Sequence, residues 1–198
     1  MKEYAVRRGG RGDLADAAAA ELDTPMWGGA SGVAAQARLC YDDESLYVAL
    51  SATEREIRAE NTRMWQEPCE DSCLEFFFCP VSGDRRYFNS EFNPKGLMFL
   101  GLGTCIGDLV RLWPLQDDLF AFRGRMTEDG WSISYAIPHE VVRRFFPAYD
   151  PRSGAVLRGN FYKCGDKTAH PHYLVWNPMP EECHTFHCPD HYGALRFL

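Results

Sequence analysis

Two tryptophans far apart in the chain, Trp65 and Trp176, each neighbour a segment that combines strand-forming and polar residues. Trp65 precedes the block 71–78, and Trp176 follows the block 160–166. A pyranose offers C–H faces to aromatic rings and hydroxyls to fixed polar groups. If folding brings the two indoles together, they would form the walls of a cleft for a small saccharide or the end of a glycan. The alternative is that both tryptophans are ordinary core or rim residues.

Two carboxylates, Glu75 and Glu91, suggest a second kind of chemistry. Glycoside hydrolysis uses a pair of carboxyl groups beside the scissile bond, and residues on adjacent strands could reach the required separation. Carboxylates on sheet faces are common, however, and the sequence offers no specific means of raising the pKa of one of them. We therefore expect non-catalytic binding, with no catalytic residues. A glycan-processing enzyme that uses Glu75 and Glu91 is the alternative.

Cysteine and histidine residues gather near the C-terminus, at Cys183, His184, His187, Cys188 and His191. Thiolate and imidazole groups are the ligands that zinc prefers. The spacing contains no CxxC pair, and aromatic residues in the same segment favour simple packing of a loop. These five residues are weak candidates for a zinc site, and a zinc-binding protein is a further alternative function. No cofactor is expected to be required.

The composition limits the partners that we expect. The chain has 198 residues and a formal net charge of −7. This charge argues against nucleic acid and anionic membranes as partners, because both select for basic patches. No apolar stretch approaches the roughly 20 residues of a membrane span. The first residues do not resemble a signal peptide, so we expect a cytoplasmic protein, or a secreted one if a leader was removed. In a reducing compartment the eight cysteines would be free thiols.

The elements that must position these groups are mostly strands. Apolar and polar patterns bounded by turn residues predict strands at 37–41, 46–53, 74–79, 87–93, 97–102, 120–126, 131–137, 156–162, 173–176 and 194–198. Helices are expected only at 13–21 and 138–146, the second with Pro138 in its first turn. This order predicts an all-β fold, an antiparallel β-sandwich of the immunoglobulin or jelly-roll kind with one or two short helices. Residues 1–198 would form a single domain, with 1–36 as an N-terminal extension packing on it.

The order of several blocks resembles carbohydrate-binding module family 9, and more closely the stand-alone, bacterial-type domains related to that family. The matching blocks are 41–48, Trp65, 71–77, 87–89, 130–138 and 192–197. The stand-alone relatives are also similar at 159–166 and 170–176. The likeness extends over residues 37–198 and implies a β-sandwich that binds sugar.

Carried over position by position, the resemblance implies how a sugar would be held. Trp65 and Trp176 would sandwich one ring, and Glu75, Asn89 and Lys163 would bind its hydroxyls. A carboxylate accepts hydrogen bonds, an ammonium donates them, and an amide does both. Because side chains alternate along a strand, Glu75 should point away from its apolar neighbours and reach a polar face. A structural ion pair between Glu75 and Lys163 is the alternative for these two residues.

The resemblance also allows a structural calcium ion. Sandwich domains that bind sugar often hold calcium through loop carboxylates, and Asp42, Asp43 and Asp71 are candidates here. Carboxylate oxygens are the ligands that calcium prefers. This expectation rests on analogy with the family.

Overall fold

The computed structural model describes residues 1–29, 32–113 and 118–198. The strands of this part are β1 (Glu3–Arg8), β2 (Ala20–Glu21), β3 (Thr24–Pro25), β4 (Ala34–Tyr41), β5 (Ser45–Thr53), β6 (Cys73–Cys79), β7 (Tyr87–Phe92), β8 (Met98–Gly103), β9 (Val110–Leu112), β10 (Arg123–Met126), β11 (Gly130–Pro138), β12 (Val156–Cys164), β13 (Tyr173–Val175) and β14 (Gly193–Phe197). The helix α1 spans His139–Phe145, and 3-10 helices span Arg11–Asp16, Pro68–Glu70, Ile106–Asp108 and Pro189–His191. None of the helices described is long and apolar enough to cross a membrane.

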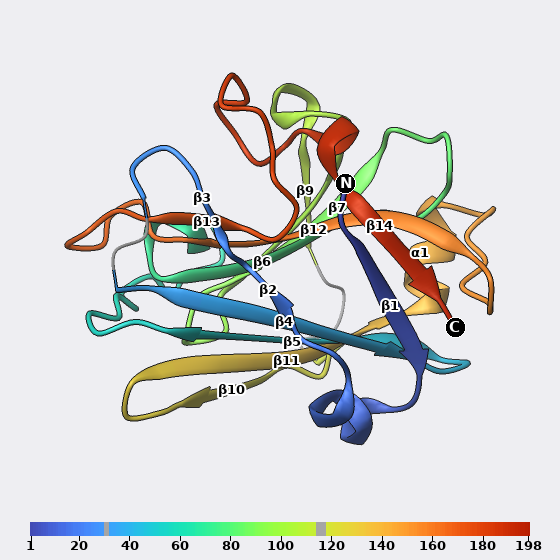
Figure 1. Ribbon diagram of the computed structural model, residues 1–198, viewed down its shortest axis with the longest axis horizontal. Helices are drawn as coiled ribbons and strands as arrows, with labels where there is room; N and C mark the ends of the chain where they lie inside the picture. The colour runs from blue at the N-terminus through green and yellow to red at the C-terminus, as the bar shows by residue number, and fades with distance from the viewer. Residues whose placement is uncertain (30–31, 114–117) are drawn as a thin grey trace.

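The strands form one curled sheet that makes two facing layers. Hydrogen-bonded neighbours follow the order β10-β11-β5-β4-β1-β14-β12-β6-β7-β8-β9. Figure 1 shows β4, β5, β11 and β10 in one layer, with β6 and β12 in the layer that faces them. Strand β1 joins the layers, because Arg7 and Arg8 pair with β4 while the preceding residues of β1 pair with β14. The all-β prediction is confirmed. Because both pairings of β1 are parallel, the sheet is mixed rather than purely antiparallel.

The main hydrophobic core lies between the two layers. Side chains alternate along a strand, and this alternation sends Leu74, Phe76 and Phe78 of β6 into the core. Val48 of β5 and Ile133 of β11 belong to the same buried cluster. Burial of large apolar side chains from both layers is the main contribution to the stability of such a fold.

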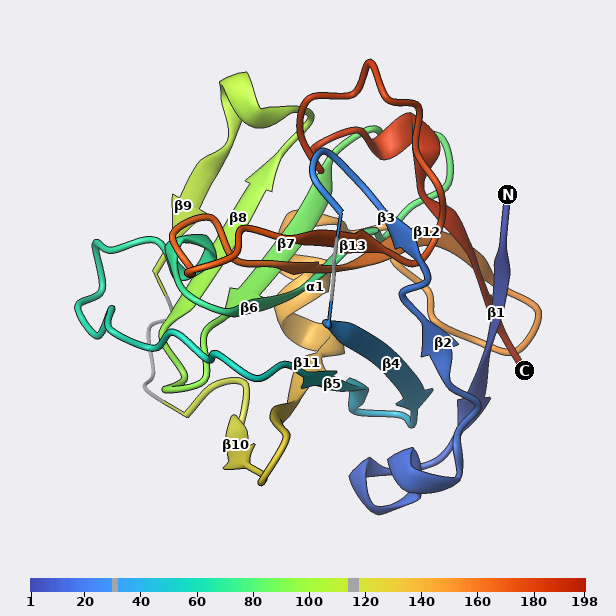
Figure 2. The same cartoon turned by 60° about the vertical axis from the view of Figure 1, so that its left-hand side comes forward.

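The opposite side of β6, β7 and β12, which we call the outer face, is covered as well. Cys73, Phe77 and Tyr162 belong to a second apolar cluster, which also contains Met26 and Phe186. Met26 precedes β4, and Phe186 lies between β13 and β14; Figure 2 shows these two connecting segments next to each other. Strand β6 is therefore buried on both sides, as its continuous apolar run predicts for a central strand.

Several local signals fold as predicted, and one does not. Helix α1 begins directly after Pro138. A turn at Asp129 and Gly130 joins β10 to β11, and the backbone N–H of Thr127 donates to the carbonyl of Gly130 (2.9 Å). The segment 13–21, predicted as a helix, forms only the end of a 3-10 helix, followed by β2. Residues 1–36, predicted as an extension that packs on the domain, contribute β1, β2 and β3 to the sheet.

Candidate functional site

The two tryptophans of the predicted sandwich lie in different environments. Trp176 is only 4% exposed, and its indole packs edge-on against Tyr4 and Phe161 in the core between the layers. Trp65 is 67% exposed in the connection between β5 and β6, with the Arg63 guanidinium 5.6 Å from the centre of its ring. Because a buried indole offers no ring face to a ligand, a sandwich of Trp65 and Trp176 does not form, and this expectation is corrected.

Lys163 is also withdrawn from solvent. Its ammonium forms an ion pair with Glu54 (2.5 Å) and donates to Nε2 of His172 (2.6 Å). His172 can accept this hydrogen bond because its Nδ1 donates to the carbonyl of His170 (2.9 Å). Lys163 is the register partner of Leu74, which points into the main core. Lys163 pairs with Glu54, so the ion pair with Glu75 that was considered as an alternative does not form.

The contacts of Glu54 keep it ionised. Burial alone would raise the pKa of Glu54, but its contacts with His172 and with the positive charge of Lys163 outweigh burial and lower that pKa to about 2. Lys163 and Glu54 are 0% and 2% exposed. A charge pair so well buried is stable only while both partners are present.

The carboxylates Glu75 and Glu91 meet on the outer face. They are register partners on the adjacent strands β6 and β7. Glu75 points away from Leu74 and Phe76, as alternation predicts, and its Oε1 accepts a hydrogen bond from the thiol of Cys164 (2.9 Å). Together these contacts place two acidic side chains next to each other in the middle of the sheet.

Asn89 supports this pair of carboxylates from the same face. Its amide nitrogen donates to Oε1 of Glu91 (2.6 Å). Its side chain is fully buried, against Gly101 on the neighbouring strand β8, where a Cβ would clash with the amide. Asn89 therefore orients Glu91 and does not itself reach solvent.

The environment of the two carboxylates favours their protonated forms. Burial raises the pKa of Glu75 to about 7. Burial, followed by the charge of Glu75, also raises the pKa of Glu91 well above its ordinary value. Two neighbouring carboxylates in a poorly solvated environment repel each other, so both groups are not easily ionised at the same time. At neutral pH the pair retains a proton, so it is able both to donate and to accept hydrogen bonds.

A pocket of about 450 Å³ opens on the outer face above these carboxylates. Its floor contains Glu75, Glu91 and Cys164. One wall is aromatic and consists of Trp27, Tyr173 and Phe186. The volume lies within the range of about 300–1,000 Å³ that is typical of small-molecule sites. Polar groups at the bottom and an aromatic wall give the pocket the mixed character of a site for polar organic ligands.

Trp27 is held firmly in this wall. Its indole N–H donates to the carbonyl of Cys183 (2.9 Å), and its ring lies 4.9 Å from that of Phe186 and 5.3 Å from that of Tyr173, between centroids. It is 38% exposed, and its φ of 41° falls in the left-handed region that a bulky residue seldom adopts. Strained backbone of this kind persists where the surroundings enforce it, often at binding sites. The sequence around Trp27 gives no signal of a binding residue, because Gly28 follows it and it lies outside any strand pattern.

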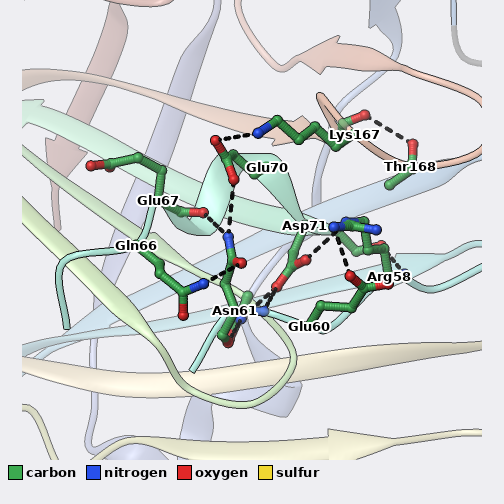
Figure 3. A network of polar contacts seen from close by, with 12 residues as sticks. Arg58, Glu60, Asn61, Gln66, Glu67, Glu70, Asp71, Lys167 and Thr168 are labelled. Carbon is green, nitrogen blue, oxygen red and sulfur yellow. Dashed lines mark hydrogen bonds and ion pairs between the residues drawn. The ribbon is translucent and has the colours of Figure 1, made fainter. Parts of the chain in front are cut away.

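Two connecting segments fix the rim of the pocket. The backbone N–H groups of Asp166 and Lys167 donate to the carbonyls of Cys69 (2.9 Å) and Glu70 (3.1 Å). The Lys167 ammonium also pairs with the Glu70 carboxylate (2.7 Å), as Figure 3 shows. Cys69 and Asp166 both line the pocket. The segment before β6 and the segment after β12 are thus joined where they border the pocket.

The carboxylates considered for calcium serve separate protein partners. Asp71 accepts from the backbone N–H of Asn61 (2.8 Å) and pairs with Arg58 (3.2 Å), a network visible in Figure 3. Asp43 pairs with Arg8 (2.6 Å). The Asp42 carboxylate accepts backbone N–H groups of its own turn (2.8 and 3.0 Å). These carboxylates stabilise loops and turns at different places in the fold.

The residues considered for zinc near the C-terminus do not converge. Within the described residues, no three of Cys183, His184, His187, Cys188 and His191 bring their ligand atoms within 4.8 Å of one another. Nδ1 of His187 instead lies 2.7 Å from the Tyr87 hydroxyl, and burial lowers the pKa of His187 to about 4. The Cys188 thiol donates to the carbonyl of Thr185 (3.5 Å). This segment packs over the outer face and supplies part of the pocket wall.

Comparison with known proteins identifies the family. The sequence profile described as carbohydrate-binding family 9 matches residues 13–197. A solved protein from Bacteroides uniformis, provisionally assigned as carbohydrate-binding, is 25% identical with a TM-score of 0.79, covering 100% of this chain and 99% of that one. A family 9 carbohydrate-binding module from Caldicellulosiruptor kristjanssonii, solved with cellotriose, is 12% identical with a TM-score of 0.71, covering 99% and 93%. The same comparison with its glucose complex gives 12% identity, a TM-score of 0.71 and coverage of 100% and 96%. No curated protein matches significantly. This chain belongs to carbohydrate-binding family 9.

Proposed function

We propose that the protein binds a small saccharide, or the end of a glycan, without covalent chemistry in the pocket of the outer face. The observation that carries this proposal is the combination of acidic groups on the pocket floor with the half-exposed ring of Trp27 in its wall. Membership of carbohydrate-binding family 9 supports it. The structures of the Caldicellulosiruptor module with glucose and with cellotriose also support a saccharide as the class of ligand.

The chemistry of the pocket suits the two surfaces of a sugar. The C–H face of a pyranose can lie against Trp27, since aromatic rings bind such faces by dispersion and electrostatics. The hydroxyls can then donate to Glu75, Glu91 and Asp166, which border the same space. Because the pKa values of Glu75 and Glu91 are raised, these two side chains also offer a proton to a hydroxyl oxygen.

In this pocket a sugar would stack on a tryptophan ring on one of its two faces, and this limits the affinity that we expect. Trp176 lies in the core, so a sugar in this pocket is stacked against Trp27 and not enclosed between two indoles. Polar groups of sugar and protein must also lose water, which offsets much of the gain from new hydrogen bonds. The proposal therefore predicts weak to moderate binding of one or two sugar residues.

Calorimetric titration with glucose, cellobiose, cellotriose and a panel of other sugars tests this function. We expect a saturable signal from at least one sugar. Trp27→Ala should weaken its affinity by roughly tenfold, which is about 1.4 kcal/mol. Trp65→Ala is the matched control, because Trp65 is more exposed than Trp27 but does not border the pocket. All titrations contain a chelator, so that the result does not depend on any metal ion.

The opposite pattern would reject the pocket as the sugar site. If Trp65→Ala abolished binding while Trp27→Ala left it unchanged, the ligand would lie against Trp65. If no sugar produced a signal, the proposed function itself would be wrong. Chromatography of the same samples for shortened oligosaccharides separates binding from hydrolysis, since non-catalytic binding returns each sugar unchanged.

A further inference from the structure

Three potential metal ligands meet at and just beneath the floor of the pocket, which Glu75 and Cys164 line and below which Cys73 is fully buried. The thiols of Cys73 and Cys164 and a carboxylate oxygen of Glu75 all lie within 4.8 Å of one another. Cys73 and Glu75 are alternate residues of β6, so both point to the outer face, and Cys164 is the register partner of Cys73 on β12. Two central, hydrogen-bonded strands thus fix the three side chains before any ion arrives.

The three ligand atoms are close enough to one another to contact a single ion. Zinc lies about 2.3 Å from thiolate sulfur and about 2.0–2.2 Å from carboxylate oxygen, so ligand atoms around one ion are ~3.3–3.8 Å apart. The three ligand atoms lie within 4.8 Å of one another, with Cys164 Sγ 2.9 Å from Glu75 Oε1, so small side-chain rotations would bring them to that spacing. Two thiolates with one carboxylate favour an ion of the zinc type over calcium or magnesium, which prefer oxygen ligands alone.

A bound cation can replace the proton that Glu75 and Glu91 retain at the floor of the pocket. Glu75 and Glu91 are both buried and lie next to each other. Lys163 is a positive charge near Glu75, and Arg111 is a positive charge near Glu91. Those cations are engaged elsewhere, Lys163 with Glu54 (2.5 Å) and Arg111 with Glu67 (3.2 Å). A divalent ion bound here would stabilise the ionised form of Glu75, which burial otherwise disfavours.

We infer that Cys73, Cys164 and Glu75 form a site for a divalent ion of the zinc class, with its fourth coordination position open to the pocket. Glu75 and Cys164 line the pocket, so the ion enters through it and meets a water molecule or a ligand hydroxyl there. Each thiol releases its proton to solvent as it becomes a thiolate ligand, and Glu75 binds as the carboxylate once any proton that it holds is also released. This site is distinct from the segment near the C-terminus, and it does not require that a sugar bind.

Cobalt titration of the reduced, metal-free protein, in the absence of sugar, tests this inference. We expect one Co²⁺ per chain, with thiolate-to-cobalt charge transfer in the near ultraviolet and strong tetrahedral d–d bands that Zn²⁺ abolishes by displacement. Cys164→Ser and Glu75→Gln should each weaken cobalt binding by roughly 100-fold or more, since each removes a direct ligand. Cys40→Ser is a control at a buried thiol of β4, and should bind as the native chain does.

A second control separates the two cysteine-containing regions. The double variant Cys183→Ser/Cys188→Ser should retain the cobalt spectrum, because neither residue belongs to the group at the pocket floor. Absence of a thiolate band in the native reduced protein overturns the inference, as does a band that survives Cys164→Ser but is lost in the double variant. Glu75→Gln preserves the side-chain volume, and circular dichroism of each metal-free variant identifies any that is unfolded. If Cys164→Ser is unfolded, undiminished cobalt binding by folded Glu75→Gln overturns the three-ligand site.

Discussion

Lys163 is a charged side chain fully removed from water, and this burial makes the residue important for stability. Replacing it with methionine would leave the Glu54 carboxylate buried without its ion-pair partner. Loss of one partner of a buried pair typically costs about 3–5 kcal/mol. We expect Lys163→Met to lower the free energy of unfolding by about 3–5 kcal/mol. Urea denaturation at neutral pH measures this change.

Lys167→Met provides a matched control for this prediction. Lys167 also pairs with a glutamate, Glu70, but its side chain is 59% exposed. Exposed ion pairs contribute roughly 0–1 kcal/mol, so this variant should denature close to the native midpoint. Equal midpoints for Lys163→Met and the native protein would show that the Lys163 pair does not contribute to stability as proposed.

The same ion pair predicts how stability depends on pH. The pKa of Glu54 is about 2 in the folded protein, below the ordinary value of 4.5. A lowered carboxyl pKa means that the stabilisation is fully present above pH 4.5 and is lost as pH falls towards 2. We expect the difference in unfolding free energy between the native protein and Glu54→Gln to shrink over this range, by up to ~3 kcal/mol at 1.36 kcal/mol per pKa unit. A difference independent of pH between 7 and 3 would contradict this assignment.

Individual residues show how far the sequence predicts such a site. Glu75 was predicted correctly to face away from its neighbours, because alternation within one strand is a local property. Lys163 could not be placed, since its side depends on the register of β12 against β6. Trp176 lies against Tyr4 and below Gly193, and neither contact is visible in the sequence around the tryptophan.

At the scale of elements, the packing of β14 on the segment that follows β13 gives a further prediction. A Cβ at Gly193 would overlap the ring of Trp176 and lie 3.1 Å from the carbonyl of Lys2. Overpacking of a core typically costs about 1–3 kcal/mol. We expect Gly193→Ala to be destabilised by this amount in thermal or urea denaturation, with a shift in tryptophan fluorescence.

Gly12→Ala is the control for this substitution. No atom lies within 4 Å of a Cβ built at Gly12. Substitutions at such open positions usually change stability by less than about 0.5 kcal/mol. If Gly193→Ala were as stable as Gly12→Ala, Trp176 would not be packed in the core as described.

Elements with strong local signals were predicted well, and those defined by distant pairing were not. Helix α1 begins after Pro138, and the β10–β11 turn contains Asp129 and Gly130. Strand β1 was not predicted, because its place in the sheet comes from parallel pairing with β4 and with β14. Strand β14 lies at the opposite end of the chain from β1. The short strand β3 likewise exists through its pairing with β13.

The whole molecule assembles its pocket from parts that are remote in sequence. Glu75 and Glu91 come from central strands, Trp27 comes from a connection before β4, and Phe186 comes from the connection between β13 and β14. The sequence predicted the family and the β architecture, and alternation along β6 predicted that Glu75 faces away from its apolar neighbours. It could not predict the aromatic wall, because that wall depends on two connecting segments meeting above the sheet.

A crystal structure of the protein soaked with glucose or cellotriose tests the location of the ligand most directly. The proposed function predicts sugar density in the pocket of the outer face, with one ring against Trp27 and hydroxyls within hydrogen-bonding distance of Glu75 or Glu91. Density stacked on Trp65, with the pocket of the outer face left unoccupied at saturating sugar, would contradict it.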